Sequence, residues 1–176
     1  MTLTVKCQPE TETQLIDSVG TQVIRDPWTG LYSRAFMEEF LTLELSRARR
    51  LWYPIGVVLF RAPRPPPNNG MTDSAMQAIL RVAAGFLGAN VRQSDVACRY
   101  SEQEFALVIP KVTPEIAFQR AAELTRGLHE LHIVLNEKII GCPEFAFRVV
   151  GFPSHGCTVQ EIVKAIDSPP ASTVGN

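Results

Sequence analysis

Histidine and cysteine side chains are the first candidates for chemistry, because they ligate metals and act as nucleophiles. His129 and His132 stand three residues apart near the end of a predicted helix. No third ligand lies near them in the sequence, and a zinc site needs at least three protein ligands. The four cysteines are Cys7, Cys98, Cys142 and Cys157. Since they are scattered and form no C-x-x-C pair, we predict no metal site, no disulfide framework and a reducing compartment.

A second candidate pair, Arg92 and Asp95, stands three residues apart where another predicted helix ends. Side chains at that spacing project from one turn, and an ion pair between them would contribute only about 0.2–0.5 kcal/mol. The same pair could instead hold a planar ligand, because a guanidinium donates two parallel hydrogen bonds and a carboxylate accepts them. The residue types alone leave both interpretations open.

The elements that must position these residues follow from the apolar pattern and the turn formers. Helical spacing predicts helices over residues 13–25, 33–51, 73–91, 113–131 and 158–166. Strands are predicted over residues 55–60, 96–100, 105–109, 133–140 and 145–152, with a hairpin around residues 101–104. This order predicts an α/β fold with a mixed sheet, helices packed on it and one core.

Local signals define how two of these helices begin and which face the first one buries. Ser33 is predicted to cap the helix over residues 33–51, and Asp73 or Thr72 the helix that follows the first long strand. Helical spacing in the first helix predicts an apolar face that comprises Phe36, Phe40, Leu43 and Leu51.

Composition limits the classes of partner. The 176 residues are 45% hydrophobic and 20% charged, which is ordinary for a globular domain and excludes disorder along the whole chain. Lys and Arg number 17 against 18 Asp and Glu, so no overall field attracts nucleic acid or an anionic membrane. The longest apolar run, residues 55–60, is too short for a membrane span, and the first residues lack a secretory signal. We therefore expect a cytoplasmic protein with neither nucleic acid nor membrane as a partner.

Residues 26–34 read DPWTGLYSR, residues 92–95 read RQSD and residues 99–105 read RYSEQEF. These three segments resemble motifs of the GGDEF family, the diguanylate cyclases. Residues 26–34, DPWTGLYSR, are similar to the family's opening D-x-L-T-G-L-x-N-R, and residues 99–105, RYSEQEF, resemble its R-Y-G-G-D/E-E-F hairpin. Arg92-Gln93-Ser94-Asp95 stands five residues before the latter's first glycine position, where the family often carries R-x-x-D, its product-binding inhibitory site. The resemblance implies a fold similar to nucleotide cyclases, in a domain over residues 26–167, with a tail and linker helix at 1–25 and a flexible tail at 168–176.

The same resemblance implies an inactive enzyme. The family joins two GTP molecules into cyclic di-GMP, and this chemistry needs divalent metal held by carboxylates. The family's metal-binding Asp at the end of the first strand aligns with Arg61, and the acid of the hairpin aligns with Gln103. Ser101 and Glu102 replace the two glycines, and only Glu104 keeps its acidic type before the phenylalanine. We therefore predict no bound metal, no cofactor and no cyclase activity.

The retained R-x-x-D motif implies that cyclic di-GMP is a ligand. An arginine at position 92 can donate to guanine O6 and N7, and the carboxylate of Asp95 can accept from the N1 and N2 hydrogens. Arg99 is a candidate phosphate contact, while Arg120 and Arg126 flank the position at which the family often places a further arginine. We predict a catalytically inactive receptor or regulatory module.

Other classes remain open. The proline-rich residues 61–70 and the face of the former active site could dock a protein partner without any ligand. Residual GTP binding through Glu104 and Asn68 or Asn69 is a third interpretation. The helix over residues 13–25 could also pair two protomers, although its apolar stripe is too short to demonstrate a coiled coil.

Overall fold

The computed structural model describes residues 5–6, 24–63, 72–135 and 137–168. The proline-rich stretch beyond residue 63, including Asn68 and Asn69, lies outside the described residues, as do Cys7 and the tail after residue 168. The same holds for residues 13–23 of the predicted N-terminal helix, and so for the pairing of two protomers that the sequence leaves open for it. Its last residue, Arg25, is not helical but forms a β-bridge with Tyr32.

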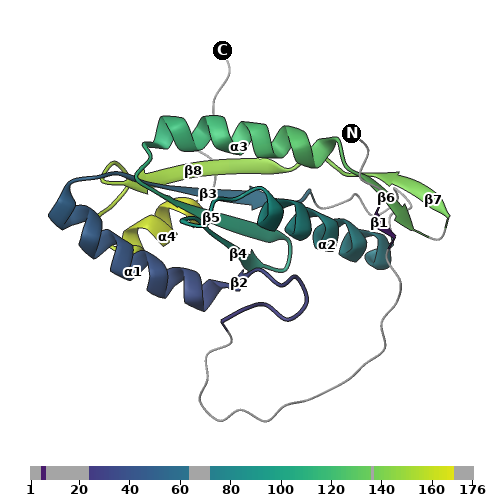
Figure 1. The fold of residues 1–176 in the computed structure, drawn as a ribbon, viewed down its shortest axis with the longest axis horizontal. Coiled ribbons are helices and arrows are strands. Elements are labelled where there is room, and N and C mark those ends of the chain that lie inside the picture. Colours follow the sequence, from purple (N-terminus) through teal and green to yellow (C-terminus); the bar gives the residue numbers. More distant parts are fainter. Residues whose placement is uncertain (1–4, 7–23, 64–71, 136, 169–176) are drawn as a thin grey trace, which may run out of the picture.

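A five-stranded mixed sheet forms the centre of the molecule (Figure 1). Its strands, in spatial order, are β2 (Tyr32–Ser33), β4 (Val96–Ser101), β5 (Glu104–Pro110), β3 (Ile55–Arg61) and β8 (Ala146–Phe152). β2 is parallel to β4, and all other neighbours are antiparallel. The predicted α/β class, the mixed sheet and the β4–β5 hairpin are therefore confirmed.

Helices cover both faces of this sheet. In the described residues they are α1 (Arg34–Leu51), α2 (Asp73–Ala89), α3 (Pro114–His129) and α4 (Val159–Asp167). Val58 and Phe60 of β3 join the apolar layer of α2 and α3, whereas Val57 and Leu59 join that of α1 and α4. Because successive strand residues point to opposite faces, β3 needs apolar residues throughout. The sheet thus separates two buried layers, where we had expected one core.

The predicted strand over residues 133–140 is wrong. It divides into β6 (His132–Leu135) and β7 (Lys138–Gly141), which form an antiparallel hairpin outside the main sheet. Glu137 has a φ of 63° in the turn between them. β1 (Val5–Lys6) pairs parallel to β6 and completes a second, three-stranded sheet.

The buried face of α1 differs in part from the predicted one, since Phe36 and Phe40 pack half-buried against the core as predicted but the other two residues do not. Leu43 and Leu51 are 61% and 64% exposed. The buried residues are Met37, Leu41, Glu44, Leu45 and Ala48. Spacing alone misplaced the face because a charged residue, Glu44, occupies one of its positions. Its carboxylate accepts hydrogen bonds from the Tyr53 hydroxyl (2.7 Å) and from Arg47 Nη1 (3.2 Å).

Helix caps position the segments that reach the candidate site. Ser33 Oγ accepts a hydrogen bond from the backbone N–H of Phe36 at 3.2 Å, which confirms the cap of α1. At α2 the cap is Thr72, whose hydroxyl accepts from the N–H of Ala75 at 3.2 Å. Asp73 is therefore the first helical residue, and its carboxylate does not serve as the cap.

Candidate functional site

The turn between α2 and β4 holds the first candidate pair. The backbone N–H of Asp95 donates to the carbonyl of Arg92 at 3.0 Å. In return, the Asp95 carboxylate accepts from the N–H of Arg92 at 3.1 Å and from the Ser94 hydroxyl at 3.0 Å. Asp95 is 9% exposed, whereas Arg92 is exposed. Among the ion pairs of the described residues there is none between these two side chains. Asp95 fixes the turn, and the Arg92 guanidinium is left for another contact.

A hollow of about 380 Å³ lies beside this turn. Its lining includes Arg25, Leu31, Tyr32, Val91, Arg92 and Asp95. Arg25 donates to the carbonyl of Gly30 at 2.8 Å, and its guanidinium carbon lies 4.2 Å from the centre of the Tyr32 ring. Sequence reasoning missed this second arginine, although it directly precedes the motif at residues 26–34. The pairing of β2 with β4 brings the two segments together.

Arg120 lies close to the same turn, and Arg126 lies further along α3. Arg120 Nη2 donates to the carbonyl of Asn90 at 2.5 Å, at the C-terminus of α2. Arg120 also pairs with Glu123 at 3.3 Å. Arg126 is exposed, and its neighbour Gly127 lies against the Phe86 ring, one helical turn before Asn90. Arg120 thus bonds to the α2 end, whereas Arg126 has no hydrogen bond or ion pair to that end among those found in the described residues.

The other predicted residues gather at the β4–β5 hairpin. Arg61, the last residue of β3, lies opposite Glu104, the first residue of β5. Its Nε and Nη2 atoms each lie 2.6 Å from Glu104 Oε1. The Ser101 hydroxyl donates to Oε2 at 2.8 Å. Both oxygens of the retained acid are therefore engaged, and a guanidinium offsets its charge.

A hollow of about 500 Å³ opens beside this ion pair and is lined by Arg61, residues 101–104 and Glu144. Glu102 and Glu144 are exposed at its rim. A hard divalent cation prefers several carboxylate oxygens and no adjacent cationic side chain. In the described part of the chain no three His, Cys, Asp or Glu side chains are arranged to hold a metal. The residues present do not fit a magnesium site. Glu144 was not among the residues predicted from the sequence, because it belongs to no motif.

Arg99 faces a third hollow, of about 440 Å³, which also borders the hairpin. Its guanidinium lies 4.3 Å from the centre of the Trp28 ring and donates to the carbonyl of Glu102 at 2.8 Å. Asp73 and Gln103 line the same hollow. The structure does not bring Arg99 into the hollow of Arg92, and its place is at the hairpin.

The buried cysteines offer no nucleophile. Burial raises the pKa of the Cys98 thiol to about 12, and burial also raises the pKa of Cys142 to about 11. A thiol attacks as the thiolate, so neither group is reactive near neutral pH.

Comparison with known families decides what this arrangement belongs to. The family model described as "Diguanylate cyclase, GGDEF domain" matches residues 23–169. The chain belongs to the GGDEF family. Within the described residues, no helix of this GGDEF domain has the length and apolar character needed to cross a membrane.

Solved structures share the fold of this GGDEF domain at low sequence identity. A sensory box/GGDEF family protein from Caulobacter crescentus has a TM-score of 0.73 at 20% identity, over 82% of this chain and 93% of that one. The GGDEF domain of DgcB from the same organism, in complex with c-di-GMP, has a TM-score of 0.72 at 14% identity, over 88% and 89%. Diguanylate cyclase SiaD from Pseudomonas aeruginosa, in complex with its activator SiaC, has a TM-score of 0.73 at 20% identity, over 82% and 55%.

Proposed function

We propose that this GGDEF domain is catalytically inactive and binds cyclic di-GMP in the hollow beside Arg92 and Asp95, as a receptor or regulatory module. The observation that carries the proposal is a contrast between the two ends of the α2–β4–β5 segment. At the hairpin an arginine neutralises the remaining acid, whereas at the turn an arginine and a carboxylate line one hollow without an ion pair between them.

Inactivity is supported by the electrostatics of the hairpin. Phosphoryl transfer between two triphosphates depends on metal ions that neutralise the developing charge. The guanidinium of Arg61 forms an ion pair with the Glu104 carboxylate, and residue 103 is a glutamine with a neutral amide. Loss of one charge-stabilising group in an active site costs about 10²–10³ in rate. Residual GTP binding through Glu104 is disfavoured for the same reason.

Binding of cyclic di-GMP is supported by the chemistry of the Arg92 hollow. A guanidinium can donate two hydrogen bonds to the O6/N7 edge of guanine. The Asp95 carboxylate already accepts two hydrogen bonds, but an ionised carboxylate offers about four acceptor positions, so it can still accept from a base. Arg25 in the hollow supplies positive charge for the phosphates, and Arg120 at the α2 end is a second cation nearby, although it pairs with Glu123. The DgcB domain, which shares this fold and was solved in complex with c-di-GMP, supports the proposal.

Titration calorimetry with cyclic di-GMP tests the proposal. Wild type is expected to bind, and Arg92→Ala is expected to weaken binding by a factor of about 5 to 150, since a bidentate contact to guanine is worth about 1–3 kcal/mol. Lys164→Ala is a control, because this exposed cation lies on α4 and lines no part of the hollow. No heat with wild type, or equal affinity in Arg92→Ala, would reject the site.

Docking of a protein partner is the second candidate function. SiaD, a cyclase with the same fold, was solved in complex with a protein activator. A pull-down with this domain would favour the second candidate if a captured protein were insensitive to both cyclic di-GMP and GTP. Release of that protein by cyclic di-GMP, but not after Arg92→Ala, would instead support the receptor.

A further inference from the structure

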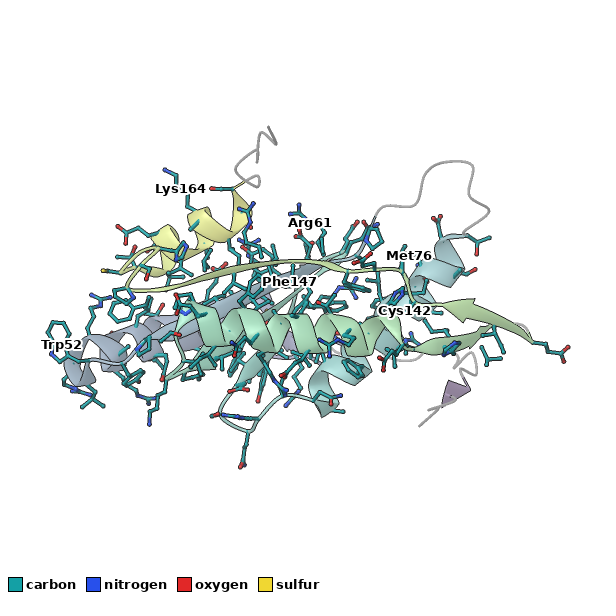
Figure 2. All side chains as sticks on the ribbon, turned by 90° about the horizontal axis from the view of Figure 1, so that it is seen from above. Trp52, Arg61, Met76, Cys142, Phe147 and Lys164 are labelled. Atoms are coloured by element: carbon teal, nitrogen blue, oxygen red, sulfur yellow. The ribbon has the colours of Figure 1, made fainter. Side chains whose placement is uncertain are left out.

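The C-terminal end of α1 exposes an unusual combination of side chains. Trp52 follows the helix in a left-handed conformation, with φ 57°, and is 90% exposed. Leu51 beside it is 64% exposed. Figure 2 shows Trp52 at one end of the molecule, well apart from Arg61. We call Arg49, Arg50, Leu51, Trp52 and the nearby Lys111 the α1 tip.

The charged residues of the α1 tip are all basic. Arg49, Arg50 and Lys111 are exposed, and none of them takes part in the ion pairs found among the described residues. The ammonium of Lys111 lies 5.7 Å from the ring centre of Tyr53, which places it next to the helix end. A neighbouring arginine, Arg47, is also exposed, but it pairs with buried Glu44 at 3.2 Å.

One acid close to Arg49 of the α1 tip, Glu161, is committed to the N-terminus of α4. Its carboxylate accepts hydrogen bonds from the N–H groups of Cys157 (2.7 Å) and Thr158 (3.1 Å), and these bonds hold the pKa of Glu161 below its usual range. The tip therefore keeps a local positive charge although the chain as a whole carries −1.

The shape of the α1 tip selects between partners. With 90% of its surface exposed, the Trp52 side chain projects from the molecule and does not lie in a groove. A projecting indole needs a partner soft enough to admit it, and a lipid headgroup layer is such a partner. Tryptophan is enriched at the interface between membrane and water, because its ring is largely apolar and its N–H can donate to a polar partner there. Basic residues beside it are attracted to anionic lipids.

We propose that the α1 tip binds the surface of a bilayer that contains anionic lipid. Trp52 and Leu51 enter the headgroup region, and Arg49, Arg50 and Lys111 face the lipid phosphates and carboxylates. From the net charge of the whole chain we expected no membrane partner. The net charge does not exclude this contact, because the attraction is local and acts within a Debye length of about 10 Å. This contact uses neither the Arg92 hollow nor the hairpin, so it stands or fails independently of the function proposed above.

Sedimentation of the full chain with vesicles tests this inference. Wild type is expected to bind vesicles of phosphatidylcholine with phosphatidylserine at low salt, and to lose binding on pure phosphatidylcholine or in high salt. Arg50→Gln is expected to weaken binding about fivefold, the equivalent of about 1 kcal/mol per basic residue. Lys164→Gln is the matched control, since it removes one exposed helical cation away from the tip.

Trp52→Ala separates insertion from simple charge attraction. The variant is expected to bind vesicles more weakly and to lose the blue shift of indole emission that wild type shows on vesicle binding. The fold should be unaffected, because the Trp52 side chain is 90% exposed. Equal binding by wild type, Arg50→Gln and Lys164→Gln would overturn the proposal. Capture on beads coated with polyglutamate without any binding to the vesicles would also overturn it, and would assign the tip to an acidic protein instead.

Discussion

At the scale of single residues, the pair of Arg61 and Glu104 determines what the hairpin can bind. A guanidinium in contact with a carboxylate oxygen at 2.6 Å opposes a metal cation at the same place. Neutral Gln103 supplies no charge that would attract a cation to the hairpin. The residues nearest the hairpin can therefore recognise polar groups, but they offer no set of acids for a divalent ion.

We predict that incubation of the wild-type domain with GTP and magnesium yields no cyclic di-GMP by mass spectrometry. The double variant Arg61→Asp with Gln103→Asp restores two acids and is expected to gain magnesium-dependent GTP binding in a filter assay. Arg25→Ala is a control for general charge effects, since Arg25 lines a different hollow. Product formed by the wild type would contradict inactivity, and GTP binding that did not differ between wild type and the double variant would contradict the role given to Arg61.

At the scale of elements, a buried carboxylate ties the end of α1 to the chain that follows it. Glu44 accepts a 2.7 Å hydrogen bond from the Tyr53 hydroxyl. Burial, followed by the hydrogen bond to Glu44 and its negative charge, raises the pKa of Tyr53 to about 12. Loss of the hydroxyl would leave a buried acceptor without this donor.

Tyr53→Phe is expected to lower the free energy of unfolding by about 1–3 kcal/mol at pH 8. The folded pKa of about 12 is above the unfolded value of about 10, so the contribution of the hydroxyl is complete below pH 10 and is lost between pH 10 and 12. Urea unfolding should therefore show a difference between wild type and variant that narrows over that range. Tyr32→Phe serves as the control, because the Tyr32 ring stacks on Phe36 without a hydroxyl hydrogen bond among those described. A difference that stayed constant with pH would contradict the assignment.

Sequence patterns predicted helices and strands well where the apolar residues of a segment follow one clear pattern. The continuous apolar run of β3 and the turn residues of the β4–β5 hairpin required no knowledge of distant contacts. The face of α1 was misjudged because Glu44 is buried only by virtue of its hydroxyl and guanidinium partners. The β6–β7 hairpin was missed because residues 136–137 carry no glycine or proline signal, although Glu137 adopts a positive φ of 63°.

At the scale of the whole molecule, the candidate sites depend on contacts between distant segments. The motif at residues 92–95 could be found in the sequence, but the presence of Arg25 in its hollow follows from the parallel pairing of β2 with β4. Likewise, Arg61 and Glu104 are 43 residues apart, and only the register of β3 with β5 brings them into contact. Arg99, predicted as a phosphate contact, lines the hollow beside Trp28 and not the one beside Arg92, because the fold decides which hollow a side chain of β4 faces.

A cation that is part of the polypeptide cannot be removed by a chelator. Because Arg61 supplies the positive charge beside Glu104, the hairpin should keep its order when free divalent ions are withdrawn. We expect the melting temperature to be the same in EDTA and in millimolar magnesium, as measured by differential scanning calorimetry. A rise in melting temperature with magnesium would reveal a cation site and contradict this expectation. The domain would thus keep its structure through fluctuations of cellular magnesium that alter metal-dependent nucleotide enzymes.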